Sequence, residues 1–113
     1  MTPTSSPCSM FGAFNLRDGY DLASFKSVYD AFCQHLKDEG YVASWRIWER
    51  ARHSGYDSGF PDVEIMIEMT FVDHAAALES WDYVESRSEP MHGLHFASNK
   101  QIRDAFFVLM NEV

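Results

Sequence analysis

The spacing of apolar residues changes several times along this 113-residue chain. Between Leu22 and Leu36 the apolar positions recur at steps of three and four, which places them on one face of a helix. Asp21 precedes this run and can cap the helix, and Gly40 follows it and can supply the left-handed residue after its end. The pattern therefore predicts an amphipathic helix that buries one face.

Two later stretches, residues 41–51 and 63–71, alternate with a period of two instead, as half-buried strands do. When Ile47 is placed opposite Ile67 in an antiparallel pair, the polar face matches as well. On that face the opposed pairs are Arg46 with Glu68, Trp48 with Met66, and Arg50 with Glu64. Facing opposite charges contribute roughly 0.2–1 kcal/mol per pair. We therefore predict this register, with an ionic ladder on one face of the sheet.

Shorter runs complete the predicted order. Residues 10–16 are aromatic, end at a turn signal and predict the first strand. Residues 74–86 predict a second helix, capped by Asp73, and Pro90 marks the first turn of a short further helix. Residues 102–110 are apolar on both faces, which predicts a final strand covered on both sides.

This order of elements, βαββαβ, is typical of ferredoxin-like α+β domains, with a four-stranded antiparallel sheet and helices on one face. A single domain over residues 10–113 is expected. Residues 1–9, rich in Pro, Ser and Thr, predict a disordered lead-in. The uncovered sheet face would carry Trp48, Met66 and large apolar groups of the first and last strands. Because such a patch usually marks an interface, we expect two copies to pack sheet to sheet.

Composition narrows the possible partners. The formal net charge of −8 and the lack of a basic patch argue against nucleic acid. No apolar run approaches the length of a membrane span, and the N-terminus does not resemble a signal peptide. Two cysteines, Cys8 and Cys33, are too few for a disulfide framework. These features predict a cytoplasmic protein without nucleic-acid or membrane partners.

Few side chains suggest chemistry. His92 and His95 share one side of a helix, where they could bind a ligand or simply lie at a surface or subunit contact; zinc would need more ligands, so no metal site is predicted. Asn15 is polar in an apolar strand and could bond a substrate oxygen or only mark the strand end. Trp81 could line a pocket for a flat ligand or belong to the core.

The charged sheet face and the hairpin loop each allow two interpretations. Arg46, Trp48 and Glu68 could bind a polar part of a ligand, or the charges could form a structural ladder that fixes the register. In the long loop, Tyr56 and Phe60 could cover a pocket mouth or contact a partner subunit.

The element order, together with Asn15, Trp81 and the His-x-x-His stretch, resembles the dimeric α/β-barrel proteins that include the antibiotic-biosynthesis-type monooxygenases. The resemblance implies a homodimer of an uncharacterised family with a cavity for a modest apolar ligand between sheet and helices. It also implies a monooxygenase-like oxidation without a cofactor, with Asn15, Trp81 and His92 around the substrate.

Two alternatives stay open. In haem-degrading members of that group, an Asn, a Trp and a His in comparable places line the pocket and the His binds the iron. Haem would then be held by His92 or His95. The other alternative is a non-catalytic dimeric binding or structural protein, for which fold-level similarity gives no decision.

Overall fold

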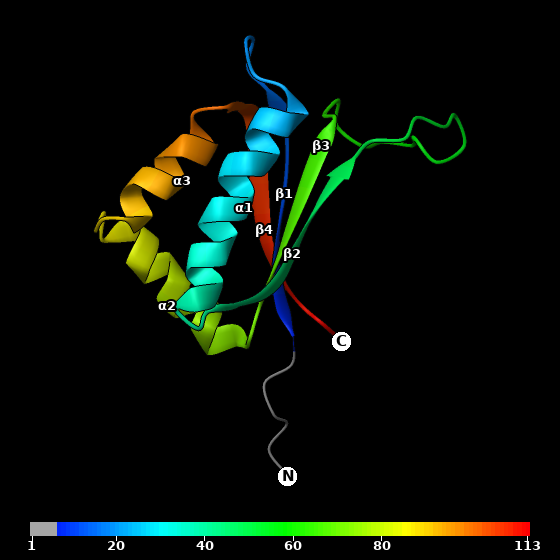
Figure 1. Ribbon diagram of the computed structural model, residues 1–113. Coiled ribbons are helices and arrows are strands. Elements are labelled where there is room, and N and C mark those ends of the chain that lie inside the picture. The colour runs from blue at the N-terminus through cyan, green and yellow to red at the C-terminus, as the bar shows by residue number, and fades with distance from the viewer. Residues whose placement is uncertain (1–6) are drawn as a thin grey trace.

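Four strands form one antiparallel sheet in the computed structural model, which describes residues 7–113 (Figure 1). The strands are β1 (Cys8–Leu16), β2 (Val42–Glu49), β3 (Ile65–Phe71) and β4 (Ile102–Asn111). Their order in the sheet is β2-β3-β1-β4, so β2 and β4 form the two edges. The helices α1 (Leu22–Asp38), α2 (His74–Glu85) and α3 (Met91–Asn99) lie on one side. The predicted ferredoxin-like fold is confirmed.

The long helix α1 begins and ends at the predicted residues. The carboxylate of Asp21 accepts a hydrogen bond from the backbone N–H of Ser24 at 2.8 Å, and the Ser24 hydroxyl accepts one from the Asp21 N–H at 3.2 Å. This reciprocal capping box satisfies two backbone donors at the helix start. After the helix, Gly40 has a φ of 90°, a backbone conformation that glycine adopts without steric cost.

The predicted register of β2 and β3 is also confirmed. Ile47 lies opposite Ile67 on the helix side, and Trp48 lies opposite Met66 on the other face. Beyond the strand ends, the Arg50 N–H donates to the Glu64 carbonyl at 2.8 Å, which continues the same register. Alternate residues of β3, beginning with Ile65, are buried under the helices. The remaining face of the sheet has no covering layer within the described chain and is called here the open face.

The ionic ladder predicted on the open face has different partners. Within residues 7–113 no ion pair joins Arg46 to Glu68. Instead, the Glu68 carboxylate accepts a hydrogen bond from Trp48 Nε1 at 3.2 Å, and the Arg46 guanidinium carbon lies 5.9 Å from the Trp48 ring centroid. At the loop Arg50 pairs with Asp57, and Arg52 pairs with both Asp62 and Glu64. The prediction was right about which residues face each other and wrong about which side chains pair.

The first strand begins earlier than predicted. Cys8 and Ser9 pair with both β3 and β4 and so belong to β1, not to a disordered lead-in. The Glu112 N–H also donates to the Pro7 carbonyl at 2.9 Å, which extends the pairing to the start of the described chain. The rest of the predicted lead-in, residues 1–6, lies outside the described residues.

Strand β4 is not covered on both sides in the single chain, contrary to the prediction. Its side chains after Ile102 are exposed. Phe106, opposite Ala13, lies on the open face, and Phe107, opposite Gly12, lies on the helix side. The helix side stays uncovered because α3 packs mainly on α1, and α2 makes only limited contact with the sheet. The apolar side chains of β4 are therefore exposed on both faces in the single chain.

Candidate functional site

A pocket of about 540 Å³ lies between the sheet and the helices. Its floor consists of apolar side chains from three strands: Met10 of β1, Met69 and Phe71 of β3, and Phe107 and Leu109 of β4. The pocket lies where α3 packs mainly on α1, while α2 packs on α3 and makes only limited contact with the sheet. A floor of thioether and aromatic groups favours an apolar ligand.

The absence of a side chain at Gly12 shapes this floor. A Cβ atom at Gly12 would lie 2.5 Å from the Phe107 ring and 3.2 Å from Cγ1 of Ile67. Because glycine leaves that space empty, the Phe107 ring can lie over β1, where it lines the pocket. The position of Phe107 therefore depends on the glycine in the neighbouring strand.

The roof of the pocket comes from all three helices. Phe32 and Leu36 of α1 and Val84 of α2 lie inside, and Trp81 of α2 lies among the lining residues with 61% of its surface exposed. Half-exposed aromatic side chains at the edge of an apolar pocket are suited to contact a ligand without closing the pocket. The structure thus places Trp81, predicted from the sequence, beside a cavity.

His95 of α3 is the one ionisable side chain among the described residues that line this pocket. Its ring lies 5.5 Å from the Phe32 ring, centroid to centroid. Burial, and to a smaller extent the neighbouring His92, lowers the pKa of His95 below the ordinary histidine value. No hydrogen bond within residues 7–113 occupies its ring nitrogens. His95 can therefore offer a neutral imidazole to a ligand, as donor or acceptor.

The structure does not bring Asn15, Trp81 and His92 together. His92 lies on the exposed side of α3, away from the lining residues. Asn15 lies outside the pocket, and both ends of its amide are occupied: Nδ2 donates to the Asp62 carbonyl at 3.0 Å, and Oδ1 accepts from the Glu64 N–H at 3.0 Å. A direct role for Asn15 or His92 with a substrate stays a prediction.

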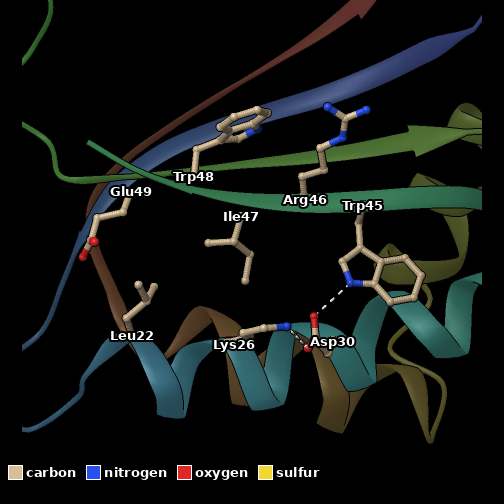
Figure 2. Close-up of a pocket in the computed structure, with 8 residues that line it drawn as sticks. All are labelled: Leu22, Lys26, Asp30, Trp45, Arg46, Ile47, Trp48 and Glu49. Atoms are coloured by element: carbon tan, nitrogen blue, oxygen red, sulfur yellow. Dashed lines mark hydrogen bonds and ion pairs between the residues drawn. The ribbon is translucent and has the colours of Figure 1, made fainter. Parts of the chain in front are cut away.

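A second hollow, of about 440 Å³, runs between α1 and the edge strand β2 (Figure 2). Trp45 Nε1 and Lys26 Nζ both donate to the Asp30 carboxylate, at 2.9 and 2.6 Å. Burial acts to raise the pKa of Asp30, but these hydrogen bonds outweigh it and hold the pKa below its ordinary value. These three polar groups satisfy one another. Two of the candidate ligand-binding residues, Arg46 and Trp48, also line this hollow.

The other candidate ligand-binding residues lie away from the pocket under the helices. Figure 2 shows Arg46 and Trp48 pointing from β2 to the side opposite α1. Glu68, which bonds Trp48, is on the same open face. Of the four candidate ligand-binding residues, only His95 lines the pocket between sheet and helices. Binding by Arg46, Trp48 and Glu68 stays a prediction and would require a different surface.

A cysteine, a histidine and an asparagine meet near the start of β1, but their geometry does not suit nucleophilic catalysis. Cys8 Sγ lies 3.7 Å from His74 Nδ1, and Asn111 Oδ1 lies 3.3 Å from the same nitrogen. A relay needs the two groups on different ring nitrogens. Burial also raises the pKa of the Cys8 thiol, which disfavours the reactive thiolate.

Two further structural findings bear on the class of site. Among residues 7–113 there is no group of three or more His, Cys, Asp and Glu side chains placed to hold a metal ion. In the same part of the chain, every helix is too short or too polar to cross a membrane.

The strand order and the helices on one face of the sheet define an α+β protein with a ferredoxin-like fold. Three solved structures with this fold are similar to the chain. SnoaB, a cofactor-independent oxygenase from Streptomyces nogalater, matches with a TM-score of 0.67 and 12% identity, over 96% of this chain and 95% of that chain. A hydroxynitrile lyase from Passiflora edulis matches with a TM-score of 0.70 and 10% identity, over 97% of this chain and 96% of that chain. A dimeric ferredoxin-like protein of unknown function from Jannaschia sp. CCS1 matches with a TM-score of 0.64 and 10% identity, over 94% of this chain and 99% of that chain. At these identities the similarity establishes the fold alone.

The sequence itself matches one family over residues 10–113, a family of unknown function, DUF6614. The chain therefore belongs to DUF6614. No curated protein matches the sequence. The expected resemblance to dimeric α/β-barrel proteins is confirmed by the solved structures, and the expectation of an uncharacterised family is confirmed by the family match.

Proposed function

We propose that this protein is a homodimer in which each chain binds a small apolar ligand in the pocket between sheet and helices. The observation that carries the proposal is the lining of that pocket, which is apolar except for Ser80, Asn99 and the single ionisable group of His95. Burying apolar ligand surface there contributes about 25 cal/mol per Å². The dimeric state is supported by the dimeric ferredoxin-like neighbours and by the uncovered apolar side chains of β4.

The reaction that best suits such a pocket is a monooxygenase-like oxidation without a cofactor. An apolar pocket with a few polar groups can bind an electron-rich ligand, which itself supplies the electrons for the reaction, and can orient that ligand toward dioxygen. In this proposal the Trp81 ring packs against the ligand and orients it, and the neutral His95 ring forms a hydrogen bond with a polar atom of the ligand. Support comes from SnoaB, which shares the fold and is a cofactor-independent oxygenase.

The alternative functions use the same pocket. A non-catalytic binding protein would return the ligand unchanged, whereas an oxygenase would consume dissolved oxygen together with the ligand. A haem protein would need an axial ligand, and His95 is the histidine that faces the pocket with its ring nitrogens unoccupied within the described chain. Haem binding stays a prediction that the resemblance implies.

Ligand binding can be tested with N-phenyl-1-naphthylamine, a neutral probe that fluoresces in apolar surroundings. We expect the purified protein to enhance its fluorescence in a saturable manner. Trp81→Ala should raise the dissociation constant about tenfold, because losing roughly 50 Å² of apolar contact costs about 1.3 kcal/mol.

Phe96→Ala is the matched control, because Phe96 is also a largely exposed aromatic side chain on a helix but lines neither hollow. It should leave the dissociation constant of the probe unchanged. Equal losses in both variants would place the probe on a general apolar surface and would contradict the proposed site.

A further inference from the structure

The segment that joins β2 to β3, residues 50–64, has no place in the proposed ligand site. None of its residues lines either of the two hollows described above. Two of its aromatic side chains are nevertheless exposed, Tyr56 by 87% and Phe60 by 45%. We propose that this segment, called here the arm, clasps the second copy of the chain. The proposal rests on the homodimer proposed above and adds a specific contact to it.

The arm is organised around one side chain, Arg50, which is largely buried. Its Nη1 donates to the carbonyls of Pro61 and Val63 at 2.8 and 3.2 Å. Its Nη2 pairs with the Asp57 carboxylate at 3.4 Å, and the guanidinium carbon lies 5.4 Å from the centroid of the Phe60 ring. One guanidinium thus connects the middle of the arm to its return half and holds the arm in a defined shape.

The base and the tip of the arm are held by two further side chains. At the base, the Asn15 amide of β1 bonds the backbone of Asp62 and Glu64, so the arm is tied to the sheet. At the tip, His53 Nδ1 accepts from the N–H of Tyr56 at 3.3 Å, which closes a tight turn. Asn15 is therefore a positioning residue for the arm. Tyr56 is presented on an ordered turn, and such order lowers the entropy that a contact would cost.

The direction of the arm favours a second copy of the chain as its partner. Figure 1 shows the three helices on one side of the sheet and the arm extending away from them on the other. A copy that packs on the open face would lie on the side toward which the arm extends. Tyrosine is enriched at the energetic centres of protein interfaces. The arm also carries charges of both signs, such as Arg52 and Asp62, which does not suit a nucleic acid or an anionic membrane.

Photo-cross-linking tests the contact directly. The full chain is made with p-benzoylphenylalanine in place of Tyr56 and is irradiated at concentrations where light scattering gives a dimer. We expect a covalent product of twice the chain mass. The same photoreactive residue in place of Phe96, which is 59% exposed on α3, should give no such product.

The contribution of the contact is measured by the dimer dissociation constant. Tyr56→Ala should raise it at least about fivefold, the change that distinguishes an interface anchor from a neutral contact. Phe96→Ala should leave it unchanged. An unchanged constant for Tyr56→Ala, or a dimer with no cross-link from position 56, overturns the clasp and leaves the homodimer intact. A monomer at all concentrations overturns both proposals.

Discussion

At the scale of single residues, His95 is the group whose surroundings most clearly change its chemistry. Because its pKa is lowered by burial and by His92, we expect its ring protons, followed by NMR, to titrate below the ordinary value of about 6.5. The unfolded chain then takes up this proton at a higher pH than the folded chain. The free energy of unfolding should therefore decrease as the pH falls from about 6.5 to the folded pKa.

His92→Gln gives an internal check on the cause. Removing the neighbouring charge should move the His95 titration upward, toward the ordinary value, without reaching it, because burial is the larger cause of the shift. A His95 ring that titrates at or above about 6.5 in the unaltered protein would contradict the buried position described for it.

The sequence identified the residue types of the site better than their directions. Histidines three positions apart on a helix point about 60° apart, so the sequence placed His92 and His95 on one side. Only the rotation of α3 against α1 decides that His95 faces the pocket and His92 faces outward. Asn15 could not be interpreted from its neighbours, because its partners, Asp62 and Glu64, are far along the chain.

At the scale of elements, the pairing of Gly12 with Phe107 couples β1 to β4. Gly12→Ala should lower the free energy of unfolding by about 1–3 kcal/mol, because the added methyl group would clash with the Phe107 ring and would also lie close to the Ile67 side chain. This cost exceeds the roughly 0.4–1 kcal/mol gained from a less flexible unfolded chain. Urea denaturation monitored by circular dichroism measures the change.

The double variant separates the clash from other effects. In a Phe107→Ala background the ring is gone, so Gly12→Ala should cost at least about 1 kcal/mol less than it does alone. Equal costs in both backgrounds would show that the ring does not occupy the space above Gly12.

The spacing of apolar residues predicted the strands and helices, because each element must place its apolar residues on the face that is buried. Moving β2 by one residue against β3 would turn Ile47 toward the open face, so the register was determined by pattern alone. The ion pairs of the predicted ladder were not determined by this pattern, because a long charged side chain can reach several partners. Arg50 forms an ion pair with Asp57 of the arm, and the alternation of residues in the strands does not predict this partner.

At the scale of the whole molecule, the surface around β4 is the part that the single chain leaves incomplete. The strand was predicted to be covered on both sides because its sequence is apolar on both faces, yet the helices leave even the inner face partly open. An edge strand of this composition, exposed to water, is prone to aggregate. In the proposed dimer, a second chain on the open face would cover the outward side chains of β4, such as Phe106, whereas Phe107 and Leu109 on the helix side would remain available to the ligand pocket.

A charge placed on the open face should disrupt a dimer that is formed through that face. Phe106, 44% exposed there in the single chain, should be buried in the dimer. Phe106→Glu should therefore convert the protein to monomers by light scattering, because an unpaired carboxylate in an interface is strongly disfavoured. Phe96→Glu adds the same charge to an exposed phenylalanine on α3 and should leave the dimer intact. If Phe106→Glu stays dimeric with an unchanged dissociation constant, the open face is not the interface and the subunits associate through the helices or the edges of the sheet.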